Sequence, residues 1–345
     1  MTTVGLVGFG MAGATFHAPL LHAAGIEVAA ISTANPERIA AAQAAAPRAK
    51  IVPTAAELLD LSGIDFVVIA SPSGLHMEQA LAALEAGLPC VVDKPLACDA
   101  SAALELLDRA EELGVPLTVF QNRRYDPEFC TMRELVEREA VGDIYRTEFR
   151  WERWRPEPKK RWREQLTAVD GGGLLLDLGT HLIDQAVLLY GPVESVYAEI
   201  DARTTTAEDD TFLALRHTSG LLTHITASSV SGAPGPRARI VGSRGTYLLG
   251  SAGEEFTAFA DANAGEGSHG WIVRGEQREA VPAAAGDAAD FYRKVAHALA
   301  SPDRQAGMPV DPRDAVHVLA VIDAARTSSE DGRVVEVLTP GQAPA

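Results

Sequence analysis

Three glycines follow the first apolar run of the chain. The run Val4–Val7 leads directly into Gly8-Phe9-Gly10-Met11-Ala12-Gly13, and a helical stretch near Thr15–Ala24 comes next. In this order the first glycine allows a tight turn, the second lets the backbone approach a pyrophosphate, and the third lets the helix pack closely on the strand. A purely structural turn is the alternative for the motif alone. Within a strand–loop–helix unit, however, the motif predicts dinucleotide binding by Gly8, Gly10, Met11, Ala12 and Gly13.

The residues up to 121 continue this alternation of strand and helix. Short apolar runs without polar alternation, separated by Ala-rich helical stretches, are typical of a parallel sheet covered on both faces. We therefore predict an α/β fold, a doubly wound parallel sheet in a coenzyme-binding domain spanning 1–121. The expected strands are Val4–Val7, Glu27–Ser32, Ile51–Val52, Asp65–Ala70, Cys90–Val92 and Leu117–Phe120, and the further helices lie near Pro36–Ala46, Leu75–Ala86 and Ser101–Leu113.

From residue 122 onward the pattern changes. Alternating β-branched runs separated by turn signals predict strands that pair antiparallel, in an α+β domain spanning 122–345 with an open, largely antiparallel sheet. A Gly/Ala-rich stretch, Asp261–Gly270, predicts a surface loop. The expected strands are Val193–Thr204, Thr211–His217, Leu221–Ser229, Ala238–Val241 and Thr246–Leu249, and the expected helices lie near Glu128–Glu139, Leu174–Leu189, Ala285–Ala300 and Pro312–Ser328.

Composition excludes several classes of protein. With 345 residues, 47% hydrophobic and 22% charged, the chain has the make-up of a two-domain globular protein. Its formal charge of −17 argues against a nucleic-acid partner, because polyphosphate is bound by clustered Lys and Arg. No apolar run approaches the roughly 18 residues that a membrane span needs. Three cysteines without CxxC spacing favour a reducing compartment, and we expect a cytoplasmic protein.

The end of the second strand bears on the choice of coenzyme. NAD-binding domains often place a carboxylate there, on the ribose 2′-hydroxyl. Here the segment reads Ser32-Thr33-Ala34-Asn35, with Arg38 one helical turn further on. Small hydroxyls and a nearby guanidinium suit a 2′-phosphate, so the segment favours NADP, with NAD as the alternative. Arg38 as a solvated helix residue is the plainer interpretation.

Polar residues also follow the fourth and fifth strands. Open α/β sheets bind ligands at the carboxyl ends of their strands, so we expect Ser71, Pro72, His76 and Asp93 beside the coenzyme. Lys94 at the same edge can donate a hydrogen bond to a substrate oxygen and stabilise an alkoxide. The alternative for a lone lysine is a solvated side chain.

A glycine-rich segment in the second half carries an acid and a base. Asp177 and His181 are four residues apart, so on a helix they share one face. The carboxylate can orient the imidazole, which is well suited to take a hydroxyl proton near neutral pH. A metal site is an alternative, although Asp184 is the only nearby candidate for a third ligand. A histidine satisfied by its neighbours in the core is the other alternative.

Together these residues resemble the Gfo/Idh/MocA family of oxidoreductases. The resemblance covers nearly the whole chain, and the residues of its motifs are most similar to those of the scyllo-inositol dehydrogenase branch. Asp93 departs from the family's usual EKP motif, in which a glutamate stands at this position; the aspartate side chain is one methylene shorter. The motifs are GFGMAGATFHAPLL (8–21), SPSGLH (71–76), VVDKPL (91–96), QNRRYD (121–126), RWRE (161–164) and GGGLLLDLGTHLIDQ (171–185).

The resemblance implies a catalytic group and a reaction. By motif, Lys94, Asp177 and His181 are the catalytic residues and also contact substrate; Asn122 and Arg123 are expected at substrate hydroxyls, and Trp162 and Arg163 near the coenzyme. A secondary alcohol of a cyclic polyol would lose its hydroxyl proton to His181 as hydride passes to the nicotinamide, without a metal. The resemblance also implies a homodimer or homotetramer formed through the open sheet.

Two other functions stay open from the sequence. The same chemistry could act on a pyranose, a sugar acid or an antibiotic-pathway sugar, because specificity depends on loops of the second domain. A dinucleotide-sensing regulator without turnover belongs to a different class of function. Loss of the lysine or the histidine would favour that regulator, and both residues are present.

Overall fold

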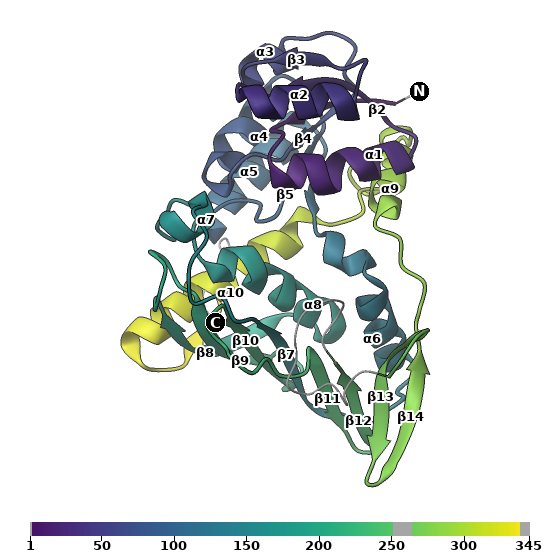
Figure 1. Cartoon of the computed structure of the whole chain (residues 1–345), viewed down its shortest axis with the longest axis vertical. Helices are drawn as coiled ribbons and strands as arrows, with labels where there is room; N and C mark the ends of the chain where they lie inside the picture. The colour runs from purple at the N-terminus through teal and green to yellow at the C-terminus, as the bar shows by residue number, and fades with distance from the viewer. Residues whose placement is uncertain (1, 251–263, 339–345) are drawn as a thin grey trace. The chain divides into compact units, whose positions relative to one another are not determined.

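The computed structural model describes residues 2–250 and 264–338, which form two compact units (Figure 1). The first unit contains Met1–Asn122 together with Asp287–Val316, and the second contains Arg123–Gly286 and His317–Ala345. The division therefore differs from a single boundary after residue 121, because the chain returns to the first unit. Helix α9 (Ala289–Leu299) explains this return: its Phe291 and Tyr292 are fully buried there.

The first unit is built on a six-stranded parallel sheet, as predicted. Its strand order is β3-β2-β1-β4-β5-β6, and the order reverses between β1 and β4. Every residue of β4, β5 and β6 is buried; since successive side chains point to opposite faces, both faces of the sheet are covered. The strands are β1 (Thr3–Val7), β2 (Glu27–Ser32), β3 (Lys50–Val52), β4 (Phe66–Ile69), β5 (Cys90–Asp93) and β6 (Leu117–Phe120).

The helices of this unit have recognisable start and stop signals. Asp99 caps the start of α5 with its side chain, which accepts the Ala102 N–H, and Gly114, with a left-handed φ of 64°, caps its end. The side chain of Asn35 caps α2 in the same way. The helices are a π-helical turn (Gly13–His17), α1 (Ala18–Ala23), α2 (Pro36–Ala45), α3 (Ala55–Leu59), α4 (His76–Glu85), α5 (Ala100–Leu113) and α9.

The second unit is built on a nine-stranded sheet, ordered β14-β13-β12-β11-β7-β10-β9-β8-β15 (Figure 1). Among the described strands of this sheet, only β7 and β10 pair parallel, so the expected, largely antiparallel sheet is confirmed. Burial alternates along β9 and β10, which means that one face is covered and the other is open. The strands are β7 (Ile144–Glu152), β8 (Val193–Asp201), β9 (Asp210–His217), β10 (Leu222–Ser228), β11 (Ala238–Gly242), β12 (Gly245–Leu249), β13 (Ser268–Arg274), β14 (Gln277–Pro282) and β15 (Val335–Glu336).

Four strands of this sheet were not expected from the sequence pattern. Strand β7 lies at its centre, but Arg146, Glu148 and Arg150 on its open face interrupt the apolar pattern; Glu148 forms ion pairs with both arginines. Strands β13, β14 and β15 are the other three. The predicted loop Asp261–Gly270 is only partly assessable, because 261–263 lie outside the described residues, and its last three residues begin β13.

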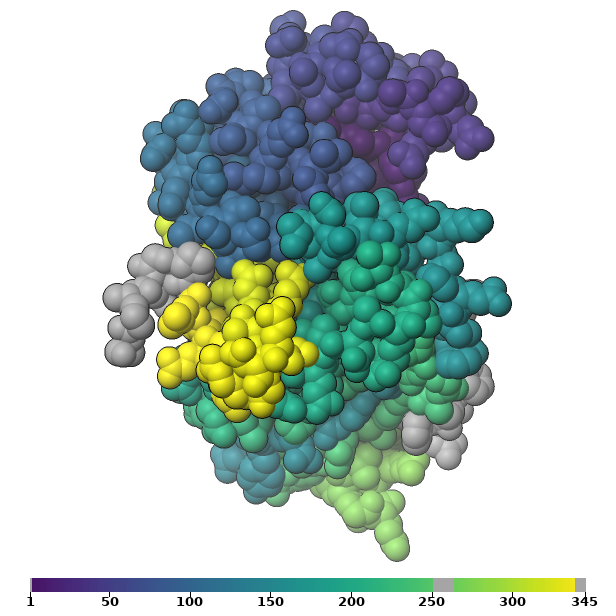
Figure 2. Space-filling view, turned by 90° about the vertical axis from the view of Figure 1, so that its left-hand side faces the viewer, coloured from purple at the N-terminus to yellow at the C-terminus, as the bar shows by residue number. Residues whose placement is uncertain are grey.

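Helices cover one face of the second sheet. Helix α8 packs against α6 and β10, and the serines of α10 bond to β8: Ser328 accepts the Ala198 N–H and Ser329 the Ile200 N–H. Figure 2 shows the last described residues, in yellow, against the surface of this unit. The helices are α6 (Pro127–Glu137), α7 (Trp162–Gln165), a π-helical turn (Leu175–Gly179), α8 (Thr180–Tyr190) and α10 (Pro312–Asp331), which begins in the first unit. Among residues 2–250 and 264–338, no helix could span a membrane.

Candidate coenzyme site and active site

The glycine loop has the geometry that a dinucleotide requires. Gly8 has a φ of +95°, which strains any other residue, and a Cβ on Gly13 would lie 2.4 Å from the Gly8 carbonyl oxygen. A Cβ on Gly10, by contrast, would meet nothing within 4 Å. The first and third glycines are therefore needed by the fold itself, whereas the second leaves open space beside the backbone. The residues present thus fit a pyrophosphate at Gly10, where the helical turn begins.

The end of β2 lies beside this loop. The Gly8 N–H donates to the carbonyl oxygen of Ser32 at 3.1 Å, and the Thr33 N–H donates to Val52 at 2.9 Å. Ser32 and Thr33 are buried, while Arg38 is exposed on the first turn of α2. Arg38 is thus on the same segment as the two hydroxyls. Met11 and Ala12 lie at the start of the helical turn, with Met11 exposed.

His76 connects the loops that follow β4 and β5. Its ring is 1% exposed, with Nδ1 2.7 Å from the carbonyl oxygen of Pro95 and Nε2 3.0 Å from that of Ser71. A short 3₁₀ turn, Ser73–Leu75, connects Pro72 to α4, whose first residue is His76. Both imidazole nitrogens face main-chain carbonyls, so the ring holds the two strand-end loops together.

Asp93 and Lys94 end β5. The buried Asp93 accepts the Lys94 N–H through Oδ1 at 2.9 Å, and its Oδ2 lies 3.7 Å from His17 Nε2. Burial alone would raise the pKa of Asp93, but the neighbouring His17, with the charges of Lys94 and His76, holds it below its ordinary value. Asp93 is therefore a carboxylate turned to the interior, and half-buried Lys94 follows it at the strand end.

In the second unit, Asp177 and His181 lie where a π-helical turn meets α8. The regular helix expected over both residues is replaced at Asp177 by the wider turn, a distortion that recurs at functional sites. Arg163 Nε lies 3.2 Å from Asp177 Oδ1, and Arg153 Nη2 lies 3.9 Å from Oδ2. Two guanidinium groups thus hold this carboxylate in place.

Glu208 supports the start of the same π-helical turn. Its carboxylate accepts the Leu175 N–H at 3.1 Å, and its carbonyl oxygen accepts the Leu174 N–H at 2.9 Å. Burial raises the pKa of Glu208, with Arg326 opposing the shift. The sequence contains no local signal for this contact, because Glu208 comes 33 residues after Leu175.

His181 and Arg123 contact the same aromatic side chain, Trp151. The His181 ring is 6% exposed and stacks on Trp151 with centroids 6.2 Å apart. The guanidinium groups of Arg123 and Arg237 lie 4.7 Å and 3.9 Å from the centre of the Trp151 ring. Sequence reasoning did not identify Trp151 or Arg237; the signal available was the aromatic residue near the end of β7.

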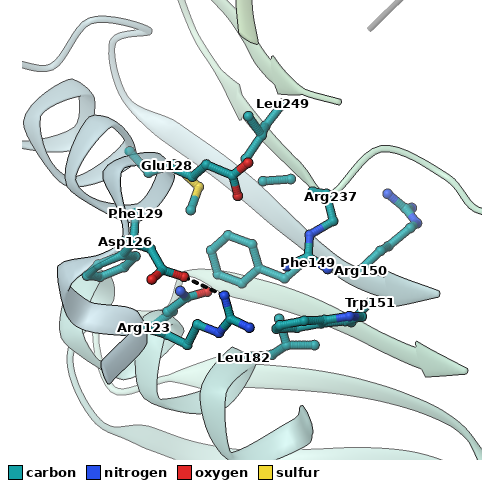
Figure 3. Close-up of a pocket in the computed structure, with 13 residues that line it drawn as sticks. Arg123, Asp126, Glu128, Phe129, Phe149, Arg150, Trp151, Leu182, Arg237 and Leu249 are labelled. Atoms are coloured by element: carbon teal, nitrogen blue, oxygen red, sulfur yellow. Dashed lines mark hydrogen bonds and ion pairs between the residues drawn. The ribbon is translucent and has the colours of Figure 1, made fainter. Parts of the chain in front are cut away.

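Figure 3 shows the small cavity beside this cluster. Arg123 Nη1 donates to Asp126 Oδ2 at 2.7 Å on the wall formed by the start of α6, and burial raises the pKa of Glu128 on the same helix. The cavity walls come from the 3₁₀ turn 122–125, from α6 and α8, and from β7, β11 and β12. They hold Arg123, Asp126, Glu128, Phe129, Met132, Phe149, Arg150, Trp151, Leu182, Gln185, Arg237, Ala238 and Leu249. Charged groups of both signs therefore surround Trp151.

The remaining predicted residues have the following positions. Asn122 and Arg123 begin the 3₁₀ turn Asn122–Tyr125, and the Arg163 guanidinium lies 4.2 Å from the centre of the Trp162 ring. Asp184, the alternative metal ligand, accepts two hydrogen bonds from Arg124, at 2.9 and 2.6 Å. Over the described ranges, no group of three or more His, Cys, Asp or Glu side chains is arranged to hold a metal ion.

Comparison with known proteins defines the class to which this fold and site belong. Residues 2–121 match the oxidoreductase family with an NAD-binding Rossmann fold, and residues 129–248 match the GFO/IDH/MocA C-terminal domain. The protein is an oxidoreductase that uses a nicotinamide dinucleotide. The chain belongs to the Gfo/Idh/MocA family, which confirms the resemblance drawn from its motifs.

Individual relatives match over nearly their full lengths. A scyllo-inositol 2-dehydrogenase (NADP(+)) of Bacillus subtilis, IolW, is 31% identical, covering 96% of this chain and 95% of the relative. An NAD-binding protein from Listeria innocua superposes with a TM-score of 0.83 at 27% identity, covering 97% and 96% of the two chains. The WlbA dehydrogenase of Bordetella pertussis, solved with NADH and UDP-GlcNAcA, gives 0.77 at 26% identity, covering 98% and 99%.

Proposed function

We propose that this protein interconverts a secondary alcohol of a cyclic polyol and its ketone with NADP, and that scyllo-inositol is its best substrate candidate. The observation that carries the proposal is the retention of Lys94, Asp177 and His181 in a chain with the glycine loop intact. The name of the Bacillus subtilis relative supports both the polyol and the coenzyme.

The proposed mechanism gives each residue one task. The coenzyme, held by Gly8, Gly10 and Gly13, supplies the hydride acceptor when bound. Lys94 donates a hydrogen bond to the substrate oxygen and stabilises the alkoxide that develops there. The His181 imidazole takes the proton from the same hydroxyl group, and ketone reduction returns that proton.

Other residues position these groups and the substrate. Asp177 stabilises the imidazolium of His181 and is itself held by Arg163 and Arg153. Arg123, and Asn122 beside it, bind substrate hydroxyls; the Asp126 carboxylate and the Trp151 ring restrict where the Arg123 guanidinium can lie. Fixed donors of this kind favour a substrate with several hydroxyl groups.

A spectrophotometric assay tests the function directly. The purified protein is incubated with NADP or NAD and scyllo-inositol, myo-inositol, glucose or xylose, and absorbance at 340 nm is followed. We expect reduction of NADP with an inositol. Turnover with glucose or xylose alone would move the assignment to a sugar dehydrogenase. Coenzyme binding without turnover of any tested substrate would contradict the polyol assignment and favour another sugar derivative or a dinucleotide sensor.

Arg38 is proposed to select the coenzyme. We expect Arg38→Ala to weaken NADPH binding by about 10- to 100-fold and to leave NADH binding unchanged, because a charge-assisted hydrogen bond to the 2′-phosphate would be lost. Titration followed by nicotinamide fluorescence measures the Kd for NADPH and the Kd for NADH. Arg48→Ala, which removes another exposed arginine of the same unit, is the matched control. Equal effects of Arg38→Ala on the two coenzymes would identify Arg38 as a surface residue only.

The open face of the second sheet is proposed as the contact between two copies of the chain. On this face Phe212 of β9 and His224 of β10 have ring centroids 5.8 Å apart, and neither residue is fully buried in the single chain. An uncovered sheet face favours association. We expect sedimentation velocity to give a dimer or tetramer, and Phe212→Glu to shift it toward the monomer. A wild-type monomer would contradict this interface.

We also propose that the protein acts in the cytoplasm on a small-molecule partner. Cys90 and Cys130 are buried and form no disulfide, as expected in a reducing compartment. The charge of −17 makes nucleic acid an unsuitable partner.

A further inference from the structure

Three buried polar side chains meet behind Lys94 in the first unit. His17 ends the π-helical turn that starts at Gly13, Asp93 ends β5, and Tyr292 lies on α9, 275 residues after His17. His17 and Tyr292 are fully buried and Asp93 is 9% exposed. Burying a polar side chain costs free energy unless another polar group takes the place of the water that it loses. Three such side chains together in the interior therefore call for an explanation.

The contacts link these groups in a chain that ends at Lys94. Tyr292 Oη lies 2.5 Å from His17 Nδ1, and His17 Nε2 lies 3.7 Å from Asp93 Oδ2. The other carboxylate oxygen of Asp93 accepts the main-chain N–H of Lys94 at 2.9 Å. Each link leads from the interior toward the residue that the proposed function places on the substrate oxygen.

The proton positions follow from the surroundings. Burial and the charge of Asp93 raise the pKa of Tyr292, so its phenol stays protonated and can donate to His17 Nδ1. With Nδ1 of His17 accepting this hydrogen bond, Nε2 is the ring nitrogen that faces Asp93. Lys94 and His76 are the other charged or titratable groups that act on this carboxylate.

Aromatic packing fixes the histidine in this orientation. Phe120 of β6, the residue paired with Asp93 in the sheet, has its ring centroid 4.4 Å from that of His17. The same Phe120 ring stacks on Tyr292 with centroids 5.5 Å apart. Neither His17 nor Tyr292 can turn away without disturbing this aromatic ring.

We propose that His17 and Tyr292 are positioning residues for Lys94, which act by fixing the carboxylate of Asp93. This proposal deepens the proposed function, on which its catalytic consequence rests. It also gives a reason for aspartate at position 93. The Asp93 carboxylate faces the interior and contacts both His17 and the Lys94 amide. The extra methylene of a glutamate would have to be accommodated within the buried cluster.

The first test measures position without activity. In the coenzyme-free protein, we expect Tyr292→Phe and His17→Gln to accelerate hydrogen exchange at the Lys94 amide, because its acceptor is less firmly held. Tyr190→Phe is the matched control, since Tyr190 is a half-buried phenol of the second unit whose oxygen accepts a hydrogen bond from Thr147 Oγ1 at 2.7 Å. Exchange at Lys94 that is unchanged in both test variants would overturn the proposal.

The second test measures the catalytic consequence. We expect Tyr292→Phe to lower kcat about three- to tenfold with little change in KM, and Tyr190→Phe to leave kcat unchanged. In an Asp93→Asn background, Tyr292→Phe should have no further effect on kcat, because it acts through the carboxylate. Equal, additive losses in both backgrounds would overturn the link to Asp93. A wild-type protein without polyol turnover would contradict the proposed function, while the exchange result would still decide the positioning role.

Discussion

Lys94→Ala and His181→Ala are each expected to lower kcat about 10²- to 10⁴-fold, the usual effect of removing a positioned proton donor or acceptor. Lys94 follows directly after β5, and His181 is held against Trp151. Neither substitution touches the glycine loop, so the Kd for NADPH should change less than about threefold, well below the 1.4 kcal/mol of a tenfold effect. Stopped-flow absorbance measures the rate of hydride transfer, and fluorescence titration measures the Kd for NADPH.

Two controls make this result specific to the proposed roles. Lys50→Ala and His22→Ala remove exposed residues of the same types and should retain full activity. Because His181 is buried, His181→Gln is measured beside the alanine variant to separate a missing base from a disturbed core. Near wild-type turnover in Lys94→Ala, or in both His181 variants, would contradict the assigned roles.

Gly10→Ala and Gly13→Ala are expected to have opposite effects on folding and on binding. A Cβ at Gly10 enters open space, so Gly10→Ala should keep the wild-type Tm but weaken the coenzyme by on the order of tenfold or more, because the pyrophosphate needs that space. A Cβ at Gly13 lies 2.4 Å from a carbonyl oxygen, so Gly13→Ala should cost about 1–3 kcal/mol of stability.

Differential scanning fluorimetry with and without NADPH distinguishes the two variants. For Gly10→Ala, the added coenzyme should no longer raise the Tm, although the protein alone unfolds like wild type. For Gly13→Ala, the Tm of the protein alone should fall by several degrees. Wild-type coenzyme affinity in Gly10→Ala would show that the pyrophosphate does not approach the backbone there.

The coenzyme half of the site was largely readable from the sequence. The glycine loop, the ends of β2, β4 and β5, and the parallel sheet all follow from local patterns, because each depends on residues close together in the chain. Asp177 and His181 were predicted in the same way. Their surroundings were not, since Arg163 and Arg153 reach Asp177 from α7 and from the segment after β7.

Local patterns also failed at particular elements. The π-helical turns at Gly13–His17 and Leu175–Gly179 have no signature in the sequence, although both lie in motifs for which we predict a function. Strand β7 was hidden by charged residues that pair with one another on the open face of the sheet. In both cases contacts with other segments outweigh the local preference.

The sequence by itself determined the family, the coenzyme-binding fold and the residues able to do the chemistry, because glycine geometry and strand-end placement are local properties. Only the tertiary structure decided what each group contacts. His17, Asp93 and Tyr292 come from distant parts of the chain, and their meeting depends on the return of α9 to the first unit. Burial makes such contacts obligatory, since a polar group removed from water must find a partner wherever the fold supplies one.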